Sequence, residues 1–588
     1  MPAVENWLIT PLDVVSNHFN SDKADFQVNL YNYYSSILKS RYKSVPFING
    51  KLNHELRAGS FVRFRCMVQD HFGPEYFDSE VVNNDGSKVC GFFVDTQSTD
   101  NCVSSGGAIS SRELYYCVSI PGETSWIKDK YRTKRYNDRN FTKTPKVSLK
   151  RQREDDEDDV GMELEEMSTN STENTNKKIR GIENSAQENS KIFTLSKNYP
   201  IPCNDNVACI VKVYDQMKTE SGKEILPNKV YEFYGILAMP NHQVGEENLA
   251  DLPKEMVEEV KAHSPPGSLI PRLHCLHIKE IEGREDFKLD PFSTADEAKY
   301  NNVANNLEFH QKNLLNVLTE ATLGDSLLAE YLLCNLVSRV VNFDINNSPV
   351  GKIVLNITNA PSNYGVFLAK FLDKLVPRLF HFHMSLSNMN KLRFAPKKNY
   401  DKMLLETGLL QIPDDLHLIV DETYLATGTL DETGVNNMKA LSQMIKDNTV
   451  DYDFKFHKIS FVHKPVVIVL SEGKSILTCD IAVKLCPTKP MPANIDRFIE
   501  SVFNQQKTDD LQLYLAMCSL NKHSLTKDHF EKLQNDFVET RQKHGTESYT
   551  VQELSNRINL CKSIYNLNQN ADVLKCCASM EIRRKERL

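Results

Sequence analysis

The sequence has no hydrophobic run long enough to cross a membrane, because its longest apolar runs have the length of short β-strands. It begins with MPAVENWLITPL, which contains an acidic residue and no basic region ahead of a hydrophobic core, unlike a secretory signal. These two absences argue against a membrane or secreted protein. We therefore expect a protein that stays inside the cell and has no membrane partner.

Metal-binding cysteine pairs are also missing, since none of the 14 cysteines has the CxxC spacing. Scattered cysteines in a long chain are typical of a reducing compartment, where thiols pack as small apolar side chains. The candidate groups are Cys203 with Cys209, His274 with Cys275 and His277, and His381 with His383. The second group alternates between the faces of an apparent strand, which favours packing over metal binding. We expect no metal site and no cofactor.

Acidic residues slightly outnumber basic residues in the sequence. The 70 Lys and Arg residues against 78 Asp and Glu give a net charge of −8 and a pI of about 6.1. This balance argues against duplex DNA as the main partner, because phosphate contacts need a basic surface. The 40% hydrophobic and 25% charged residues are typical of a soluble globular protein. The length of 588 residues is enough for roughly three or four domains.

Residues 141–196 read as a disordered acidic insert. A basic cluster there is followed directly by six acidic residues, Glu154 to Asp159, and then by a stretch of Asn, Ser, Thr and Glu with almost no aromatic or branched residues. The basic cluster consists of Lys146, Lys150, Arg151 and Arg153. It is a candidate nuclear import signal, and the alternative is charge neutralisation beside the acidic run.

The amino-terminal half shows short strand-like segments on both sides of this insert. Residues 1–59 are assigned as an N-terminal helical segment, and residues 60–280 as one β domain interrupted by the insert. The strand-like segments are Ser60 to Phe72, Val89 to Val94, Leu114 to Ile120, Ala208 to Asp215 and Lys229 to Met239. Five such strands predict a small barrel of the oligonucleotide-binding (OB) type. These barrels bind either nucleic acid or protein, and the fold does not choose between them.

The carboxyl-terminal half mixes helical and strand patterns. Apolar residues at helical spacing between Leu307 and Val341, broken at Gly324, predict a pair of helices. A further helix over Thr429 to Ile445 precedes the hairpin pattern VDYDFKFHKISF. We assign residues 300–490 to an α/β core and residues 494–588 to a helical lid. The expected fold class is therefore α/β and β multidomain.

Within this core, LHLIVDET resembles the magnesium-binding strand of a P-loop ATPase. An apolar run ends in Asp421 and Glu422, where ligands of open α/β sheets collect. In working ATPases of this kind the Asp holds the magnesium ion and the Glu orients the attacking water. The alternative for this pair is a solvated strand end, or a helix cap for the following turn.

The loop expected to bind the phosphates lacks the residues that such a loop needs. After the expected first strand, GKIVLNI, the loop contains Pro361, which has no amide donor, and Tyr364, which is bulky; the nearest downstream lysine is Lys370. The string Gly473, Lys474 and Ser475 imitates a phosphate loop but lacks the required earlier glycine. We therefore expect a degenerate ATPase core of the AAA+ type that does not bind ATP tightly.

Several long and unusual strings resemble the MCM-binding protein family (minichromosome maintenance complex-binding protein). They are SFVRFRCMVQD, YYCVSIPGETSW, YEFYGIL, HSPPGSLIPRLH, LGDSLLAEYLL, LIVDET and VDYDF. The resemblance covers the chain nearly end to end, apart from the acidic insert. It implies a nuclear, non-catalytic protein that binds MCM helicase subunits during DNA replication and helps them assemble or leave chromatin, with an indirect association with chromatin.

The chain also resembles, more faintly, the subunits of the MCM replicative helicase. Ser471 stands at about the sensor asparagine, while Gln552 and Asn559 stand where the lid pattern carries arginines. The segment SILTCDI lacks the arginine of the finger. These groups stabilise charge during phosphoryl transfer, so their joint loss predicts a protein that is not an enzyme.

Three classes of function remain open. The first is a non-catalytic adaptor of helicase subunits, which could dock on one face of a helicase ring. The second is an active ATP-dependent disassembly factor, and the third is an OB-fold protein that binds single-stranded DNA. Stabilisation by nucleotide would separate the first two, and salt-dependent binding of an oligonucleotide would favour the third.

Overall fold

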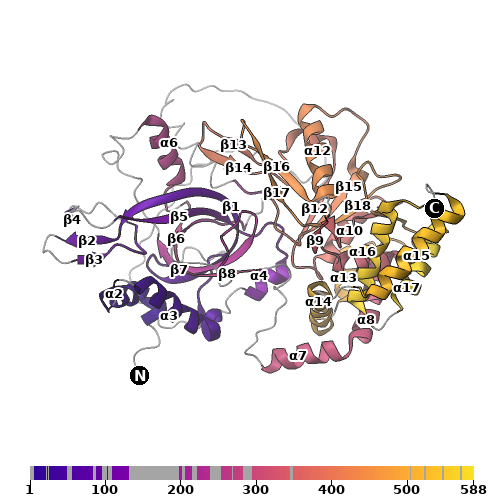
Figure 1. Ribbon diagram of the computed structural model, residues 1–588, viewed down its shortest axis with the longest axis horizontal. Helices are drawn as coiled ribbons and strands as arrows, with labels where there is room; N and C mark the ends of the chain where they lie inside the picture. The colour runs from indigo at the N-terminus through magenta and orange to yellow at the C-terminus, as the bar shows by residue number, and fades with distance from the viewer. Residues whose placement is uncertain are drawn as a thin grey trace.

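The computed structural model describes residues 6–21, 23, 25–49, 56–83, 88–95, 102–103, 109–131, 198–201, 205–214, 222–238, 253–267, 269–281, 294–344, 349–503, 505–521, 525–545, 549–569 and 572–587. They form a mixed α/β multidomain protein with several sheets (Figure 1). The expected insert at 141–196, with Lys146, Lys150, Arg151 and Arg153, lies outside these residues. None of the described helices is long and apolar enough to span a membrane.

The amino-terminal half contains a closed barrel in the order β1-β5-β6-β8-β7. Its strands are β1 (Phe61–Asp78), β5 (Ile109–Val118), β6 (Ala208–Tyr214), β7 (Val230–Ala238) and β8 (Arg272–Glu280). Strand β1 pairs with β7 through its first part and with β5 through its second. Its register shifts between Val68 and Asp70 and between His71 and Gly73. Such irregularities bend a strand, which allows β1 to serve both neighbours and close the barrel.

The prediction of one barrel strand is wrong. The segment Val89 to Val94 contributes only β3 (Lys88–Cys90), which pairs with β2 (Glu80–Asn83) in a separate sheet with β4 (Cys102–Val103). The strand cannot continue because Phe93 has a φ of 61°, and its amide donates to the Tyr214 hydroxyl at 2.7 Å. The fifth barrel strand is β8, which is parallel to β6.

Helices cover one side of the barrel (Figure 1). They are α1 (Asn6–Ile9), α2 (Pro11–Ser21) and α3 (Phe26–Arg41). Helix α3 buries Phe26, Leu30, Tyr34 and Leu38 at four-residue spacing, which places all four on one face. The Tyr34 ring stacks on Phe61 of β1, with 4.7 Å between ring centroids. This apolar face fixes the helices to the barrel.

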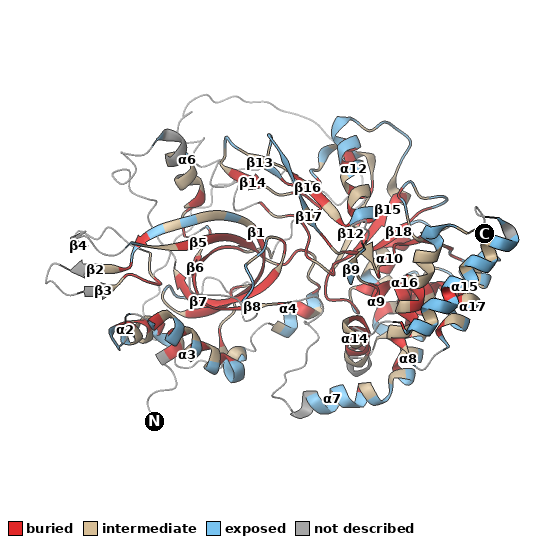
Figure 2. Ribbon diagram, in the orientation of Figure 1, coloured by how far each residue is buried: buried red, intermediate tan, exposed pale blue. Residues whose placement is uncertain are grey.

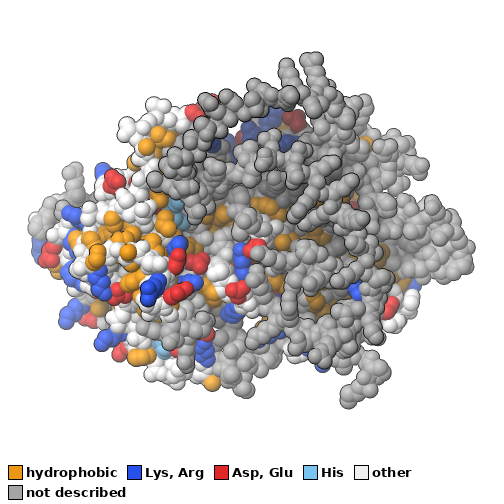
Figure 3. All heavy atoms as spheres, turned by 180° about the vertical axis from the view of Figure 1, so that it is seen from behind, with side chains coloured by type: hydrophobic (Ala, Val, Ile, Leu, Met, Phe, Trp, Pro, Cys, Tyr) orange, Lys and Arg blue, Asp and Glu red, His pale blue; other side chains and the backbone are white. Residues whose placement is uncertain are grey.

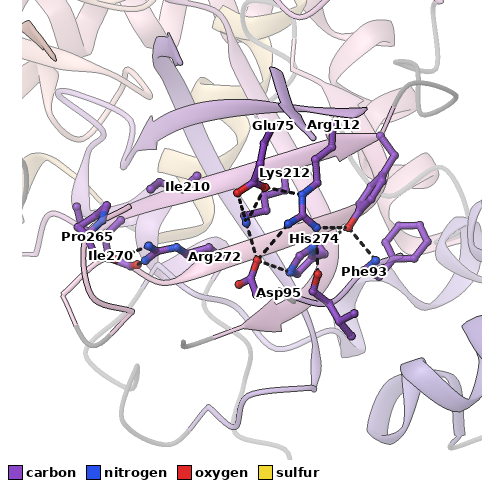
Figure 4. Close-up of polar contacts among 12 residues, drawn as sticks. Glu75, Phe93, Asp95, Arg112, Ile210, Lys212, Pro265, Ile270, Arg272 and His274 are labelled. Carbon is purple, nitrogen blue, oxygen red and sulfur yellow. Dashed lines mark hydrogen bonds and ion pairs between the residues drawn. The ribbon is translucent and has the colours of Figure 1, made fainter. Parts of the chain in front are cut away.

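A charged cluster ties the segment after β3 to the barrel strands (Figure 4). Arg112 Nε donates to Glu75 Oε2 at 2.6 Å, and Lys212 Nζ donates to Glu75 at 2.9 Å and to Asp95 at 2.5 Å. His274 Nε2 lies 3.4 Å from the same Asp95 oxygen. Nearby cations hold the pKa of Asp95 well below its usual range although burial opposes this, and burial lowers the pKa of His274 to about 4.

The carboxyl-terminal half is built on a parallel sheet in the order β12-β15-β18-β11-β19. Its strands are β11 (Leu355–Thr358), β12 (Leu379–His383), β15 (His417–Asp421), β18 (Val466–Leu470) and β19 (Ile481–Lys484). Alternate residues enter different cores, since Ile419 packs with helices on one face while Leu418 and Val420 pack on the other. The central strands β15 and β18 are buried along their whole length (Figure 2), as expected inside a parallel sheet.

Helices on the first face include the expected pair, α8 (Leu307–Ala321) and α9 (Ser326–Val337), which is confirmed. They share their core with α10 (Tyr364–Leu372) and with helices beyond residue 494. These last helices are α13 (Ile495–Val502), α14 (Gln505–Leu520), α15 (Lys527–His544), α16 (Val551–Leu567) and α17 (Val573–Lys585).

The rear surface of the molecule is mixed in character. Among the described side chains there, Lys and Arg, Asp and Glu, and hydrophobic residues are interspersed (Figure 3).

The second face carries α12 (Glu432–Asp447) and a four-stranded sheet in the order β14-β13-β16-β17. The strands are β13 (Lys397–Asn399), β14 (Leu404–Glu406), β16 (Thr449–Asp453) and β17 (Lys458–Val462). The predicted hairpin is therefore confirmed as β16 and β17. The remaining elements are α4 (Ser125–Tyr131), α6 (Lys254–His263), α7 (Thr294–Asn305), α11 (Leu386–Lys391), β9 (Asn342–Phe343), β10 (Pro349–Val350) and the 3₁₀ turns Tyr42–Ser44 and Glu422–Tyr424.

The barrel and the α/β core are joined by specific hydrogen bonds. Trp126 Nε1 donates to the Val376 carbonyl at 3.2 Å, and Gln411 Nε2 donates to the Gln69 carbonyl at 2.9 Å. These donors are buried or partly buried, so water competes poorly for them. The two parts therefore hold a defined relative position.

Candidate functional site at the edge of the parallel sheet

The carboxyl ends of three neighbouring strands meet at one edge of the parallel sheet. Asp421 ends β15, Ser471 follows β18, and the loop 359–363 follows β11. Ligands of open α/β sheets bind at this edge. The structure brings Asp421 beside Gly365, just after the expected phosphate loop, whereas Glu422 contacts the loop after β18.

The Asp421 carboxylate is fully engaged by its neighbours. His381 Nε2 lies 3.0 Å from Oδ2, and Thr423 donates to Oδ1 through its hydroxyl at 2.6 Å and its amide at 3.2 Å. The residue is only 1% exposed. Burial opposes ionisation, but these hydrogen bonds outweigh it and lower the pKa of Asp421. The carboxylate therefore caps the 3₁₀ turn Glu422–Tyr424 that follows its strand.

Helix α10 fills the space beside Asp421. Asn363 has a φ of 63°, the conformation that favours the second glycine of a phosphate loop. Counting from it, Tyr364 takes the lysine position and Gly365 the Ser/Thr position. A Cβ atom on Gly365 would lie 2.7 Å from His381 Nε2 and closer still to Asp421 Oδ2. The backbone of α10 therefore packs directly on the carboxylate.

Tyr364 points away from this edge. It is fully buried, and its hydroxyl donates to the Ala321 carbonyl at the end of α8, at 3.2 Å. Burial raises the pKa of the Tyr364 phenol beyond its usual range. The side chain at the lysine position is therefore part of the core and offers no cation to a phosphate.

Two amides of the loop donate to backbone carbonyls of the protein. The Asn359 amide donates to the Glu472 carbonyl at 3.1 Å, and the Ala360 amide donates to the Ser471 carbonyl at 3.2 Å. Pro361 has no amide hydrogen. A phosphate loop works by presenting such donors to the phosphates, and here they join the loop to the end of β18.

Glu422 holds a neighbouring loop. Its Oε1 accepts from the Ser475 hydroxyl at 2.8 Å and from the Leu477 amide at 3.3 Å, while Oε2 accepts from the Ile476 amide at 3.3 Å. Burial raises the pKa of Glu422 in spite of these bonds. The carboxylate therefore shapes residues 475–477. Taken with Asp421 and the loop, these residues do not fit a magnesium–nucleotide complex.

Comparison with known proteins decides the family. Residues 34–588 match the family described as Mini-chromosome maintenance replisome factor. The chain belongs to this family. Relatives named Mini-chromosome maintenance complex-binding protein are 31% identical in Mus musculus, over 94% of this chain and 92% of the relative, and 30% identical in Homo sapiens over the same shares. One from Arabidopsis thaliana is 27% identical over 95% of this chain and 93% of the relative.

In this member of the Mini-chromosome maintenance replisome factor family, the other expected helicase positions have structural partners. The Ser471 hydroxyl donates to Asn356 Oδ1 at 3.0 Å, and Asn559 Oδ1 accepts the Gly351 amide at 3.0 Å. Gln552 is exposed on α16 and donates to Asn556. Lys474 is exposed in a bend after β18 that leads into no helix, so the imitation phosphate loop lacks the required context.

The candidate metal groups are dispersed or packed. Cys203 lies outside the described residues, and Cys209 is buried in the barrel. His274 Nδ1 lies 2.8 Å from the Tyr214 hydroxyl, while the Cys275 thiol points to the His277 carbonyl. In the part of the chain that the structure describes, no group of three or more His, Cys, Asp or Glu side chains is placed to hold a metal ion.

Two contributions to this edge escaped sequence reasoning. His381, a candidate metal ligand for which the sequence favours structural packing, is a hydrogen-bonding partner of Asp421. Gly365 makes the approach of α10 to Asp421 possible, because any side chain would collide there. A glycine at the motif's Ser/Thr position was the available signal.

Proposed function

We propose that the chain is a non-catalytic binding protein of the MCM replicative helicase complex that acts in DNA replication. The support is the family: its relatives carry the name Mini-chromosome maintenance complex-binding protein and align over more than nine-tenths of their length. The partners are MCM subunits, and any association with chromatin is indirect, through them.

The fold proposal follows from strand order. A five-stranded closed barrel with one parallel pair, β6 and β8, supports an OB-like domain over 60–280 after the helical segment 1–59. The parallel sheet, with its acidic strand end beside a loop-to-helix junction, supports a degenerate AAA+-like core over 300–490. The helices of 494–588 correspond to its lid.

The observation that carries the non-catalytic role is the closed sheet edge. Asp421 and Glu422 keep the positions of the ATPase acids, but their oxygens hold Thr423, His381 and the loop 475–477. A chain with a ring-ATPase frame and no phosphate clamp could dock on one face of a helicase subunit without continuing the ring. We propose that it regulates assembly or unloading of MCM subunits in this way.

The test is capture of purified MCM subunits by the purified full chain, with and without Mg²⁺ and ATP. We expect capture that is equal in both conditions. The control is Glu422→Gln, which abolishes hydrolysis in a working enzyme of this kind and here should leave capture unchanged. Absence of capture, or release that requires hydrolysis and is lost in Glu422→Gln, would refute the proposal.

Nuclear localisation is part of the same proposal. It rests on the basic cluster Lys146, Lys150, Arg151 and Arg153, and the family's relation to DNA replication agrees with it. Replacing these four residues with glutamine in a fluorescent fusion should leave the protein in the cytoplasm. The matched control is replacement of Lys177, Lys178 and Arg180; unchanged nuclear entry of the first variant would contradict the assignment.

A further inference from the structure

Two loops of the four-stranded sheet come together at one corner. The tip of the β16–β17 hairpin, residues 454–457, lies against the β13–β14 turn, residues 400–403, and the Tyr400 hydroxyl donates to the Phe454 carbonyl at 3.0 Å. Six side chains gather here, which we call the hairpin-tip cluster: Tyr400, Phe454, Lys455, Phe456, His457 and Lys458. None of them takes part in the sheet edge discussed above.

Aromatic rings dominate the hairpin-tip cluster. Phe456 is 80% exposed, more than any other large hydrophobic side chain in the described part of the chain, and Tyr400 is 39% exposed. Their ring centroids are 5.9 Å apart. Phe454 and His457 stack with 5.3 Å between centroids and planes only 7° apart. A single exposed apolar side chain is ordinary on a protein surface, but exposed aromatic rings grouped at one corner mark a candidate contact surface.

Two lysines flank the rings without acidic partners. Lys455 Nζ lies 5.6 Å from the Phe456 ring centroid, and Lys458, the first residue of β17, is exposed. Among the described residues, neither ammonium group has a carboxylate within ion-pair distance. The nearest acid of the hairpin, Asp453, is occupied by the Lys455 amide at 2.8 Å and by Lys397 at 3.8 Å. The cluster therefore offers positive charge beside flat rings.

The backbone holds this arrangement in place before any ligand arrives. Lys455 has a φ of 67°, a conformation that glycine or asparagine would adopt at lower cost. The Phe454 amide donates to the His457 carbonyl at 3.0 Å and closes the turn. A lysine in a backbone conformation that costs free energy points to a binding role for its side chain.

We propose that the hairpin-tip cluster binds single-stranded nucleic acid, with unstacked bases on the Phe456 and Tyr400 rings and phosphates beside Lys455 and Lys458. Sites for single strands combine aromatic platforms with basic side chains in this way. A duplex keeps its bases stacked and demands a wide basic surface, which the net charge of −8 disfavours. The inference is independent of MCM binding and of the barrel.

The test is fluorescence anisotropy of the full chain with a labelled 20-nucleotide oligo(dT) and with a 20-base-pair duplex, at 50 mM salt. We expect tighter binding of the single strand. Phe456→Ala should weaken it by about 5- to 160-fold, the range for loss of one stacked base. Replacing Lys455 and Lys458 together with glutamine should flatten the salt dependence by about 1.4 in the log–log slope.

The matched control is Tyr76→Ala, which removes an aromatic ring that is 72% exposed on the barrel and should change affinity less than twofold. All these side chains are exposed, so the variants should unfold at the parent's urea concentration. Failure to bind oligo(dT), equal binding of duplex, or equal losses for Tyr76→Ala and Phe456→Ala would overturn the proposal. Loss of MCM capture by Phe456→Ala with oligonucleotide binding unchanged would also overturn it, since the cluster would then be a protein contact.

Discussion

Replacement of Gly365 by alanine tests the closure of the sheet edge. In an ordinary helix this change stabilises a protein by up to about 1 kcal/mol, because glycine is the less favourable residue. Here the added methyl group would meet Asp421 Oδ2 and His381 Nε2. Asp421 is buried and held on both oxygens, so it cannot swing aside at low cost.

The magnitude follows from two costs and one gain. Forcing a methyl group into a filled core costs about 1–3 kcal/mol. Disturbing the hydrogen bond between His381 and the Asp421 carboxylate costs about 1.5–3 kcal/mol more. The gain in helix propensity offsets about 1 kcal/mol. We therefore expect Gly365→Ala to lower the free energy of unfolding by about 1.5–5 kcal/mol.

Urea unfolding followed by circular dichroism and by tryptophan fluorescence measures this change. Gly473→Ala is the matched control, because a Cβ there meets nothing within 4 Å. It should change stability by less than about 0.5 kcal/mol. If Gly365→Ala were neutral or stabilising, α10 would not pack on Asp421, and the edge would have room for a ligand.

Three further predictions concern other parts of the chain. Glu422→Ala should lower stability by about 1.5–3 kcal/mol in urea unfolding, because the Ile476 amide loses its acceptor and the Ser475 hydroxyl loses the shorter of its two hydrogen bonds; an unchanged midpoint would contradict the structural role. Burial lowers the pKa of His274 from 6.5 to about 4. Between these two pH values the unfolded chain binds a proton that the folded chain does not, so the free energy of unfolding falls as pH falls from 6.5 to about 4. From pH 7 to 5 the parent should lose about 2 kcal/mol more than His274→Asn, and equal losses would contradict this. Trp126→Phe should cost about 1 kcal/mol by removing one hydrogen bond between barrel and core, and thermal unfolding unchanged by it would contradict the interface.

Local patterns in the sequence predicted much of the carboxyl-terminal half. The helical spacing of Leu314 and Leu318, then of Leu328 and Leu332, defined α8 and α9, since helix periodicity is a short-range property. The hairpin β16–β17 followed from alternation in the same way. The general assignment of a mixed α/β fold is likewise confirmed.

The barrel was harder because its closure depends on long-range pairing. The alternation of His274, Cys275 and His277 predicts a strand there, and β8 is that strand, but its place in the barrel does not follow from the alternation. Its pairing with β6 and β7 joins segments far apart in the chain, which no local pattern encodes. The segment Val89 to Val94 had the composition of a strand, but the backbone turns at Phe93.

At the candidate site, the sequence indicated which chemistry was missing but not what replaced it. The absence of a lysine could be read directly, whereas the contacts of Asp421 with His381 and of Gly365 with Asp421 join separate elements. Two carboxylates at a strand end look the same in sequence whether they hold a metal ion or a loop. Only their neighbours in space distinguish the two cases.

Isothermal titration of the purified full chain with Mg²⁺ and ATP tests the central claim most directly. Because the loop amides, Asp421 and Glu422 are engaged within the protein, we expect no saturable heat at millimolar nucleotide and no change in thermal unfolding. A bound nucleotide at a hundred times its dissociation constant would stabilise the fold by about 2.7 kcal/mol. Saturable binding that is lost in Asp421→Asn would contradict the account.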